Sequence, residues 1–220
     1  MDRAELLEQV ASIISEIDLS HPIRVAIDGI DGAGKTTLAD ELMSPVERQG
    51  RRVIRASVDG FHNPRAIRYW RGWHSPEGYF RDSFNYEAVI DNLLQPLGSG
   101  GSRQYRTAVF DYKTDSPVVS PLLQCDDHAI LLFDGIFLLR PELVNFWDLT
   151  IFLDVTFEVG MARCSQRGGG SINPAPIENR RYVEGQKIYL AECDPKAVAD
   201  LIIDNNDLSA PHFKLLRGRS

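Results

Sequence analysis

Hydrophobic residues along the chain follow two patterns that alternate. Within residues 1–20 they recur at helical spacing, with acidic residues between them. Short, mostly apolar runs at 23–27, 129–133 and 149–153 are bounded by polar or turn residues, which is typical of strands buried on both faces of a parallel sheet. Strands that alternate with helices predict an α/β fold with a mainly parallel sheet, covered by helices on both faces.

The remaining elements follow from the same patterns. Further strands are expected at 52–58 and 199–203, and helices at 35–48, 86–94, 158–166 and 177–193. Residues 63–83 show no clean period and are expected to form a loop with short helical pieces, while 105–112 and 118–123 suit a short strand pair or an irregular excursion. Without a repeat or a linker, we expect a single domain over 1–220, with an N-terminal helix at 1–20, a substrate-side excursion at about 60–125 and a lid at about 163–182.

Composition narrows the class of protein. Lys and Arg total 24 against 31 acidic residues, a net charge of -7 that argues against nucleic acid as a main partner. The three cysteines are widely spaced and suggest neither a disulfide framework nor a zinc site, which fits a reducing compartment. The most apolar run is far shorter than the roughly 20 residues that cross a bilayer. We therefore expect a cytoplasmic protein with no membrane or nucleic-acid partner; a homodimer stays open.

A complete phosphate-binding motif follows the first predicted strand. Residues 29–36 read G-I-D-G-A-G-K-T and match G-x-x-x-x-G-K-[ST], with a helix predicted directly after them. Backbone N–H groups of such a loop surround phosphate oxygens, the lysine reaches the β- and γ-phosphates, and the hydroxyl holds magnesium. The motif predicts ATP and Mg²⁺ binding by Gly29, Ile30, Asp31, Gly32, Ala33, Gly34, Lys35, Thr36 and Thr37.

Acidic residues end three of the predicted strands. In an open α/β sheet, ligands bind beyond the carboxyl ends of the strands. Asp134 follows four apolar residues, the pattern of a carboxylate that assists magnesium binding, although an aspartate there is also common turn chemistry. Asp59 ends the second strand and is a candidate catalytic base for a hydroxyl acceptor, or a turn aspartate. Asp154 is interpreted as structural.

Taken together and in order, these segments resemble the phosphoribulokinase/uridine kinase family of P-loop kinases, over about residues 23–207. The resemblance rests on 29–37, 59–62, 82–85, 109–112, 133–136 and the helix around Arg163. It implies a P-loop three-layer α/β/α fold with a small lid. It also implies an ATP-dependent kinase that transfers the γ-phosphoryl group to a hydroxyl of a small molecule, with a nucleoside as the first candidate.

The resemblance also implies roles for single residues. Asp59 matches the family's general base, and Asp82 the acid that holds the ribose hydroxyls. Phe110 matches a tyrosine that packs on the nucleoside. Arg163 and Arg167 resemble lid arginines that contact phosphates, and their four-residue spacing places them on one helix face, where a solvated pair is the alternative.

The sequence departs from the family at the position that contacts the nucleobase. Asp115 stands where the family has a histidine that contacts the pyrimidine, and an ionised carboxylate presents only hydrogen-bond acceptors. Alternatives are therefore a kinase for pantothenate, nicotinamide riboside or a sugar phosphate, or a non-catalytic nucleotide-binding protein. A regulatory GTPase would need an N-K-x-D segment, which the sequence lacks.

A segment rich in arginine and aromatic residues follows Pro64. Such a segment can stack on a ring and neutralise an anionic substrate, or it can belong to the core or an interface. His62 precedes it and is a further candidate for substrate contact. The arginines of this segment are Arg65, Arg68, Arg71 and Arg81.

Overall fold

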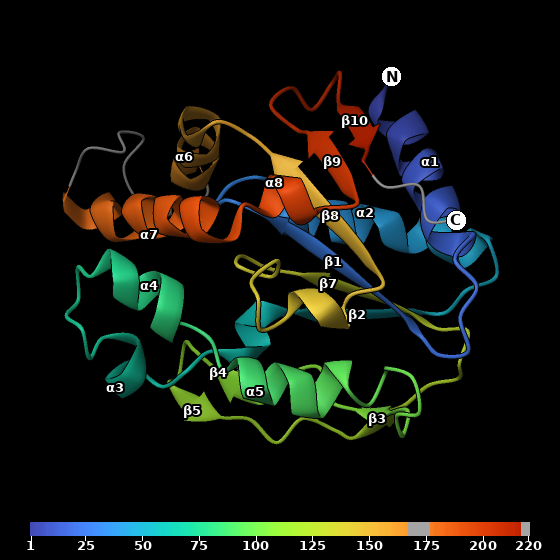
Figure 1. The fold of residues 1–220 in the computed structure, drawn as a ribbon, viewed down its shortest axis with the longest axis horizontal. Helices are drawn as coiled ribbons and strands as arrows, with labels where there is room; N and C mark the ends of the chain where they lie inside the picture. Colours follow the sequence, from blue (N-terminus) through green and yellow to red (C-terminus); the bar gives the residue numbers. More distant parts are fainter. Residues whose placement is uncertain (167–176, 217–220) are drawn as a thin grey trace.

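The computed structural model describes residues 1–166 and 177–216 and has a three-layer α/β/α architecture, which confirms the predicted fold class (Figure 1). The central sheet has the strand order β10-β9-β8-β1-β7-β2. Its strands are β1 (Ile23–Gly29), β2 (Val53–Ser57), β7 (Ile130–Asp134), β8 (Leu149–Asp154), β9 (Leu201–Asp204) and β10 (His212–Leu215). Neighbouring strands pair in parallel except β10, which pairs antiparallel with β9.

Helices precede and follow the strands, and most match the predicted ranges. The longer helices are α1 (Arg3–Ser15), α2 (Lys35–Arg48), α4 (Pro76–Asp82), α6 (Phe157–Gln166) and α7 (Ile177–Cys193). Shorter pieces are η1 (Val58–Phe61), α3 (Arg65–Arg68), α5 (Tyr86–Val89), η2 (Ile90–Leu94), η3 (Val144–Phe146) and α8 (Pro195–Val198). Among the described residues, no helix combines the length and the apolar character that a bilayer span requires.

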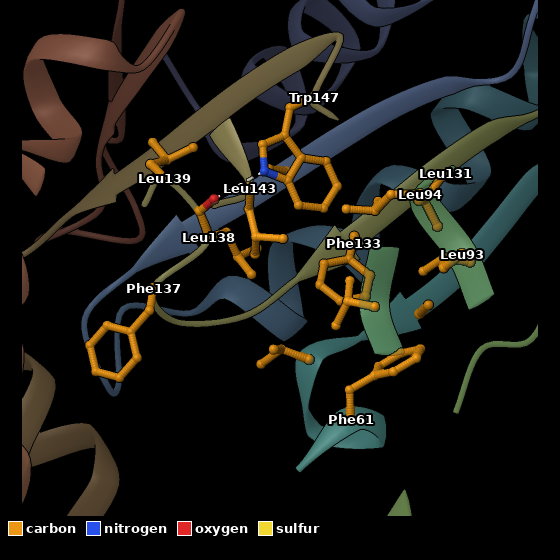
Figure 2. Close-up of a cluster of buried hydrophobic side chains, with 14 of the residues drawn as sticks. Phe61, Leu93, Leu94, Leu131, Phe133, Phe137, Leu138, Leu139, Leu143 and Trp147 are labelled. Atoms are coloured by element: carbon orange, nitrogen blue, oxygen red, sulfur yellow. Dashed lines mark hydrogen bonds between the residues drawn. The ribbon is translucent and has the colours of Figure 1, made fainter. Parts of the chain in front are cut away.

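Two hydrophobic clusters sandwich the sheet. Side chains of α1 and α2 cover one face, where they pack on alternate residues of β1 such as Val25 and Ile27. Residues from α4, α5, η2 and α7 cover the other face, together with Phe133 of β7 and Phe152 of β8. Figure 2 shows the second cluster, in which the indole N–H of Trp147 donates a 3.0 Å hydrogen bond to the carbonyl of Leu138. Because helices cover both faces of the sheet, side chains that point to either face are buried. The sequences of the central strands are therefore mostly apolar.

The excursion between η2 and β7 contains two antiparallel pairs of two residues each, in place of the one strand pair between 105–112 and 118–123 or the irregular excursion that the sequence suggests. β3 (Gln104–Tyr105) pairs with β6 (Leu123–Gln124), and β4 (Phe110–Asp111) pairs with β5 (Ser116–Pro117). The helix predicted at 86–94 instead changes to a π-helical turn at Ile90, because Gln95 N donates to the carbonyl of Ile90, five residues back. This turn buries both Leu93 and Leu94.

The amino ends of the central strands carry a buried ion pair. The guanidinium of Arg24, at the start of β1, donates to both carboxylate oxygens of Asp148, which precedes β8, at 2.9 and 3.0 Å. Asp148 also accepts from the backbone N–H of Arg24 at 2.9 Å. These bonds tie two neighbouring strands together at the edge of the sheet opposite the P-loop.

Candidate active site

The P-loop connects the carboxyl end of β1 to α2, as the sequence predicts. Gly32 and Gly34 have φ values of 75° and 95°, a conformation that favours glycine. A Cβ atom on Gly32 would also lie 2.1 Å from the carbonyl oxygen of Gly160 in α6, so a side chain at this position would not fit. The Lys35 ammonium donates to the carbonyl of Ile30 at 2.8 Å and thus lies over the loop. Loop shape and lysine position fit a bound triphosphate.

Asp134 lies beside Thr36 because β7 and β1 are neighbours, with Asp134 in register with Ile27. The Thr36 hydroxyl donates to one carboxylate oxygen of Asp134 at 2.5 Å, and an Arg55 amine lies 2.9 Å from the other. Hydroxyl and carboxylate oxygens are ligands that Mg²⁺ accepts. Among the described residues, no group of three His, Cys, Asp or Glu forms a metal cage. Two oxygen ligands suit Mg²⁺, which binds one or two protein groups together with substrate phosphates.

Asp59 lies in the 3₁₀ turn that follows β2, facing the same pocket. Desolvation raises the pKa of its carboxyl group, the nearby His62 opposes this shift, and the negative charge of Asp134 adds to it. His62 Nδ1 lies 3.0 Å from the carbonyl oxygen of Asp59, which can only accept, so Nδ1 carries the proton. Burial lowers the pKa of His62, while the hydrogen bond to the Asp59 carbonyl and the charge of Asp59 act in the opposite direction. A carboxylate with a raised pKa and an open face is suited to receive a proton.

Six of the sequence-predicted site residues line one pocket of about 400 Å³. These residues are Asp31, Lys35, Thr36, Asp59, His62 and Asp134. The pocket continues from the P-loop to α3 and α7, where Arg68 and Arg181 line it. Its volume lies within the range of small-molecule binding sites.

Other predicted substrate residues do not line this pocket. The Asp82 carboxylate accepts from Trp70 Nε1 and Arg71 Nε, both at 2.8 Å. Phe110 is 7% exposed and packs in the β4–β5 pair. Asp115 accepts from the backbone N–H of Arg65 at 2.9 Å and from the guanidinium of Arg68 at 3.0 Å.

Arg163 of α6 lies on another side of the P-loop. Its guanidinium donates to the carbonyls of Asn205 and Asn206, at 2.9 and 3.0 Å. The Asn205 side chain in turn donates to the carbonyl of Ala33 at 2.7 Å, which places the loop after β9 against the P-loop. Arg167, the second predicted lid arginine, lies outside the described residues.

Asp31 links the P-loop to the helices on the acceptor side, a role that the sequence did not suggest. Its carboxylate accepts from the Tyr79 hydroxyl of α4 at 2.9 Å and from Gln186 Nε2 of α7 at 3.0 Å. Its backbone N–H donates to Gln186 Oε1 at 2.8 Å. The P-loop therefore has a fixed position relative to α4 and α7.

Asp28, the residue before the P-loop, is fully buried. It accepts from the backbone N–H groups of Leu138 and Leu139 at 3.1 Å, and from the Tyr189 hydroxyl. Desolvation raises its pKa to about 6, against these hydrogen bonds and the charge of Lys35. The sequence shows only an aspartate at the end of an apolar strand. That pattern does not distinguish a buried structural carboxyl group from a residue of the active site.

Similar proteins of known sequence include three kinases. Uridine kinase of Brevibacillus brevis is 23% identical over 90% of this chain and 92% of its own length. A Thermoplasma volcanium protein named probable thymidylate kinase is 30% identical over 75% of this chain and 82% of its own. Uridine-cytidine kinase B of Dictyostelium discoideum is 26% identical over 65% and 57%. No family model matches the chain.

Solved structures with the same fold include two kinases of different names. A structure described as a possible uridine kinase from Bacillus stearothermophilus superposes with a TM-score of 0.71 at 24% identity, covering 90% of this chain and 97% of that one. D-glycerate 3-kinase from Cryptococcus neoformans superposes with a TM-score of 0.60 at 12% identity, covering 94% and 98%. At these identities the superpositions concern the fold alone.

Proposed function

This chain belongs to the uridine kinase-like family of P-loop kinases, and we propose that it transfers the γ-phosphoryl group of ATP to a hydroxyl group of a small molecule. The observation that carries the proposal is the convergence of Lys35, Thr36, Asp59 and Asp134 on one pocket. A nucleotide-binding protein without transfer chemistry would have no need of the carboxylate of Asp59 facing that pocket. Kinases named for uridine, cytidine and thymidylate among its relatives support a phosphotransferase.

Each of these residues has a defined task in the proposed reaction. P-loop N–H groups and Lys35 bind and neutralise the ATP phosphates. Thr36 and Asp134 would hold Mg²⁺, which would supply positive charge that neutralises the phosphates. Asp59 orients the acceptor hydroxyl and accepts its proton as the new P–O bond forms and the bond to ADP breaks.

The test of this role is Asp59→Asn, measured by ADP release with Mg-ATP and a panel of alcohols. We expect turnover to fall at least about 100-fold, because a positioned base contributes that much to proton transfer. Affinity for a non-hydrolysable ATP analogue should change little, since Asp59 is not part of the P-loop.

Asp154→Asn is the matched control. Asp154 also ends a strand but pairs with Lys196 at 2.6 Å and does not line the pocket. The Asp154→Asn variant should therefore keep the turnover of the wild type. Near-normal turnover of Asp59→Asn would reject Asp59 as the base.

Two acceptor classes remain candidates for the hydroxyl. The names of the relatives support a nucleoside such as uridine or cytidine. The placement of Arg68 and Arg181 on the pocket wall favours an anionic alcohol instead. A panel of uridine, cytidine, nicotinamide riboside, pantothenate and ribose 5-phosphate distinguishes the two classes by which acceptors stimulate ADP release.

The cellular setting belongs to the same proposal. Cys125 and Cys193 are free thiols, which supports a reducing compartment such as the cytoplasm. One continuous six-stranded sheet supports a single kinase domain.

A further inference from the structure

Two buried arginines, one from α3 and one from α7, line the pocket. Arg68 ends α3 and is 7% exposed, while Arg181 lies in α7 and is 4% exposed. The two residues are adjacent, because Arg181 Nη2 donates to the carbonyl of Arg68 at 3.0 Å. Cationic side chains are rarely buried to this degree unless an anion compensates their charge.

The charge of Arg68 is only partly compensated. One amine donates to Asp115 at 3.0 Å, but Asp115 lies at the margin of the protein with 28% of its side chain exposed. The Nε–H group of Arg68 is buried and has no hydrogen-bond partner among the described residues. A buried N–H donor without an acceptor costs about 1–3 kcal/mol, which an incoming oxygen ligand would recover.

Arg181 has no carboxylate partner in the described part of the chain. Its amines donate to the carbonyls of Gly72, Trp73 and Arg68, at 3.0 to 3.4 Å, and its guanidinium lies 4.6 Å from the centre of the Tyr69 ring. Burial lowers the pKa of Arg181, and the neighbouring cation Arg68 acts in the same direction. Carbonyl and ring contacts orient the guanidinium but leave a full positive charge beside the pocket.

The acidic residues of the pocket interact with groups other than Arg68 and Arg181. Asp31 accepts from Tyr79 and Gln186, and Asp134 accepts from Thr36 and pairs with Arg55. Asp59 is the base of the proposed reaction and interacts with His62. An excess of positive charge therefore remains at the wall formed by α3 and α7.

We propose that this wall is a subsite for an anionic group of the acceptor, a phosphate or a carboxylate, bound by Arg68 with the support of Arg181. The inference rests on the proposed function, since it describes the alcohol whose hydroxyl lies near Asp59. Guanidinium groups bind both anions through the same paired N–H geometry, so the shared chemistry is a planar or tetrahedral oxyanion on the substrate. The subsite would favour the charged member of any pair of otherwise similar alcohols.

A binding experiment that does not depend on turnover tests the subsite. The protein is saturated with Mg²⁺ and a non-hydrolysable ATP analogue to occupy the P-loop, then titrated calorimetrically with inorganic phosphate and, separately, with acetate. Binding should be about 10- to 100-fold weaker in Arg68→Gln, the usual loss for a charge-assisted hydrogen bond. Phosphate binding alone would identify a phosphorylated acceptor, and acetate binding alone a carboxylic acid.

Two further variants separate binding from folding. Arg81→Gln makes the same chemical change on α4, at an arginine that pairs with Glu77 and Glu192 outside the pocket, and should leave the titration unchanged. Asp115→Asn removes the carboxylate that competes for Arg68, and Asn tolerates the positive φ of 55° at this position. Anion binding should tighten in Asp115→Asn, whereas a purely structural role for the Arg68–Asp115 pair predicts damage in both variants.

Turnover with matched acceptors then connects the subsite to the reaction. Ribose 5-phosphate is compared with ribose, and glycerate with glycerol. We expect the charged member of each pair to have the higher kcat/KM in the wild type, and this advantage to disappear in Arg68→Gln. Equal anion binding by wild type and Arg68→Gln, or no anion binding by wild type, would overturn the inference. Phosphorylation of neutral alcohols would in that case leave the kinase proposal intact. Anion binding that depends on Arg68 without phosphorylation of any acceptor would reject the kinase proposal and retain the subsite.

Discussion

Asp28 makes the stability of the protein depend on pH. Its pKa of about 6 in the folded chain lies above the usual 3.8, because burial disfavours its charged form. Between these two pH values the folded chain binds more protons than the unfolded chain. The stability that comes from protonated Asp28 is therefore fully present below about pH 4 and is lost as the pH rises to about 6.

Asp28→Asn should remove this dependence. A shift of this size corresponds to about 3 kcal/mol, at 1.36 kcal/mol per pKa unit. We expect the difference in unfolding free energy, wild type minus variant, to fall by about that amount between pH 4 and pH 7 in urea titrations. A difference that stays constant across this range would contradict the raised pKa. Comparison at each pH cancels the titration of groups common to both proteins.

Sequence alone could predict the residues of the P-loop, because their spacing is local and chemically specific. Asp59 and Asp134 could also be nominated as site residues from the sequence, since the carboxyl ends of parallel strands meet at one edge of the sheet. Arg181 could not be nominated in this way, because it contacts Arg68 across 113 residues of sequence. The partners of Asp82 and Asp115 were likewise hidden, since short irregular helices determine which arginine reaches which carboxylate.

Helices α4 and α7 pack closely at Gly185, and this contact supports the P-loop. A Cβ atom there would lie 2.7 Å from the carbonyl oxygen of Pro76 and 2.9 Å from the ring of Tyr79, whose hydroxyl binds Asp31. The absence of a side chain at Gly185 thus allows Tyr79 to reach the nucleotide-binding loop.

Gly185→Ala should destabilise the protein by about 1–3 kcal/mol, as overpacking does, although helix propensity alone predicts a gain of about 1 kcal/mol. Gly78→Ala in α4 is the matched control, since its Cβ would have its nearest neighbour at 3.4 Å, an ordinary contact. Thermal unfolding of both variants gives the answer. A rise in Tm for Gly185→Ala would show that the two helices do not pack this closely.

The predicted elements agree with the structure where the elements are long, as in α2 and α7. They fail where hydrogen bonding departs from a regular period or where an element is short. The strand β10 pairs antiparallel at the edge of the sheet and has exposed side chains, so its sequence carries no apolar run. The π-helical turn η2 has an ordinary helical composition, so its sequence does not distinguish it from a regular α-helix.

Ligand binding should stabilise the whole molecule. A ligand that binds only the folded state at 100 times its Kd contributes about 2.7 kcal/mol. For a chain of 220 residues this corresponds to a rise in Tm of about 5–10 °C. We expect this rise with Mg²⁺ and a non-hydrolysable ATP analogue, and a much smaller one when EDTA removes the metal from Thr36 and Asp134. A rise of equal size with and without EDTA would reject those two residues as magnesium ligands.

The Arg24–Asp148 pair has a consequence for how the protein can diversify. It joins β1 and β8 at the edge of the sheet away from the pocket, where both strands begin. Scaffold integrity and substrate choice therefore depend on different ends of the same strands. Natural selection can replace residues of α3 and the loops around it, and so change the acceptor, without disturbing the contacts that hold the opposite edge of the sheet together. Substrate range should accordingly vary among descendants of this chain faster than the residues that hold the sheet together.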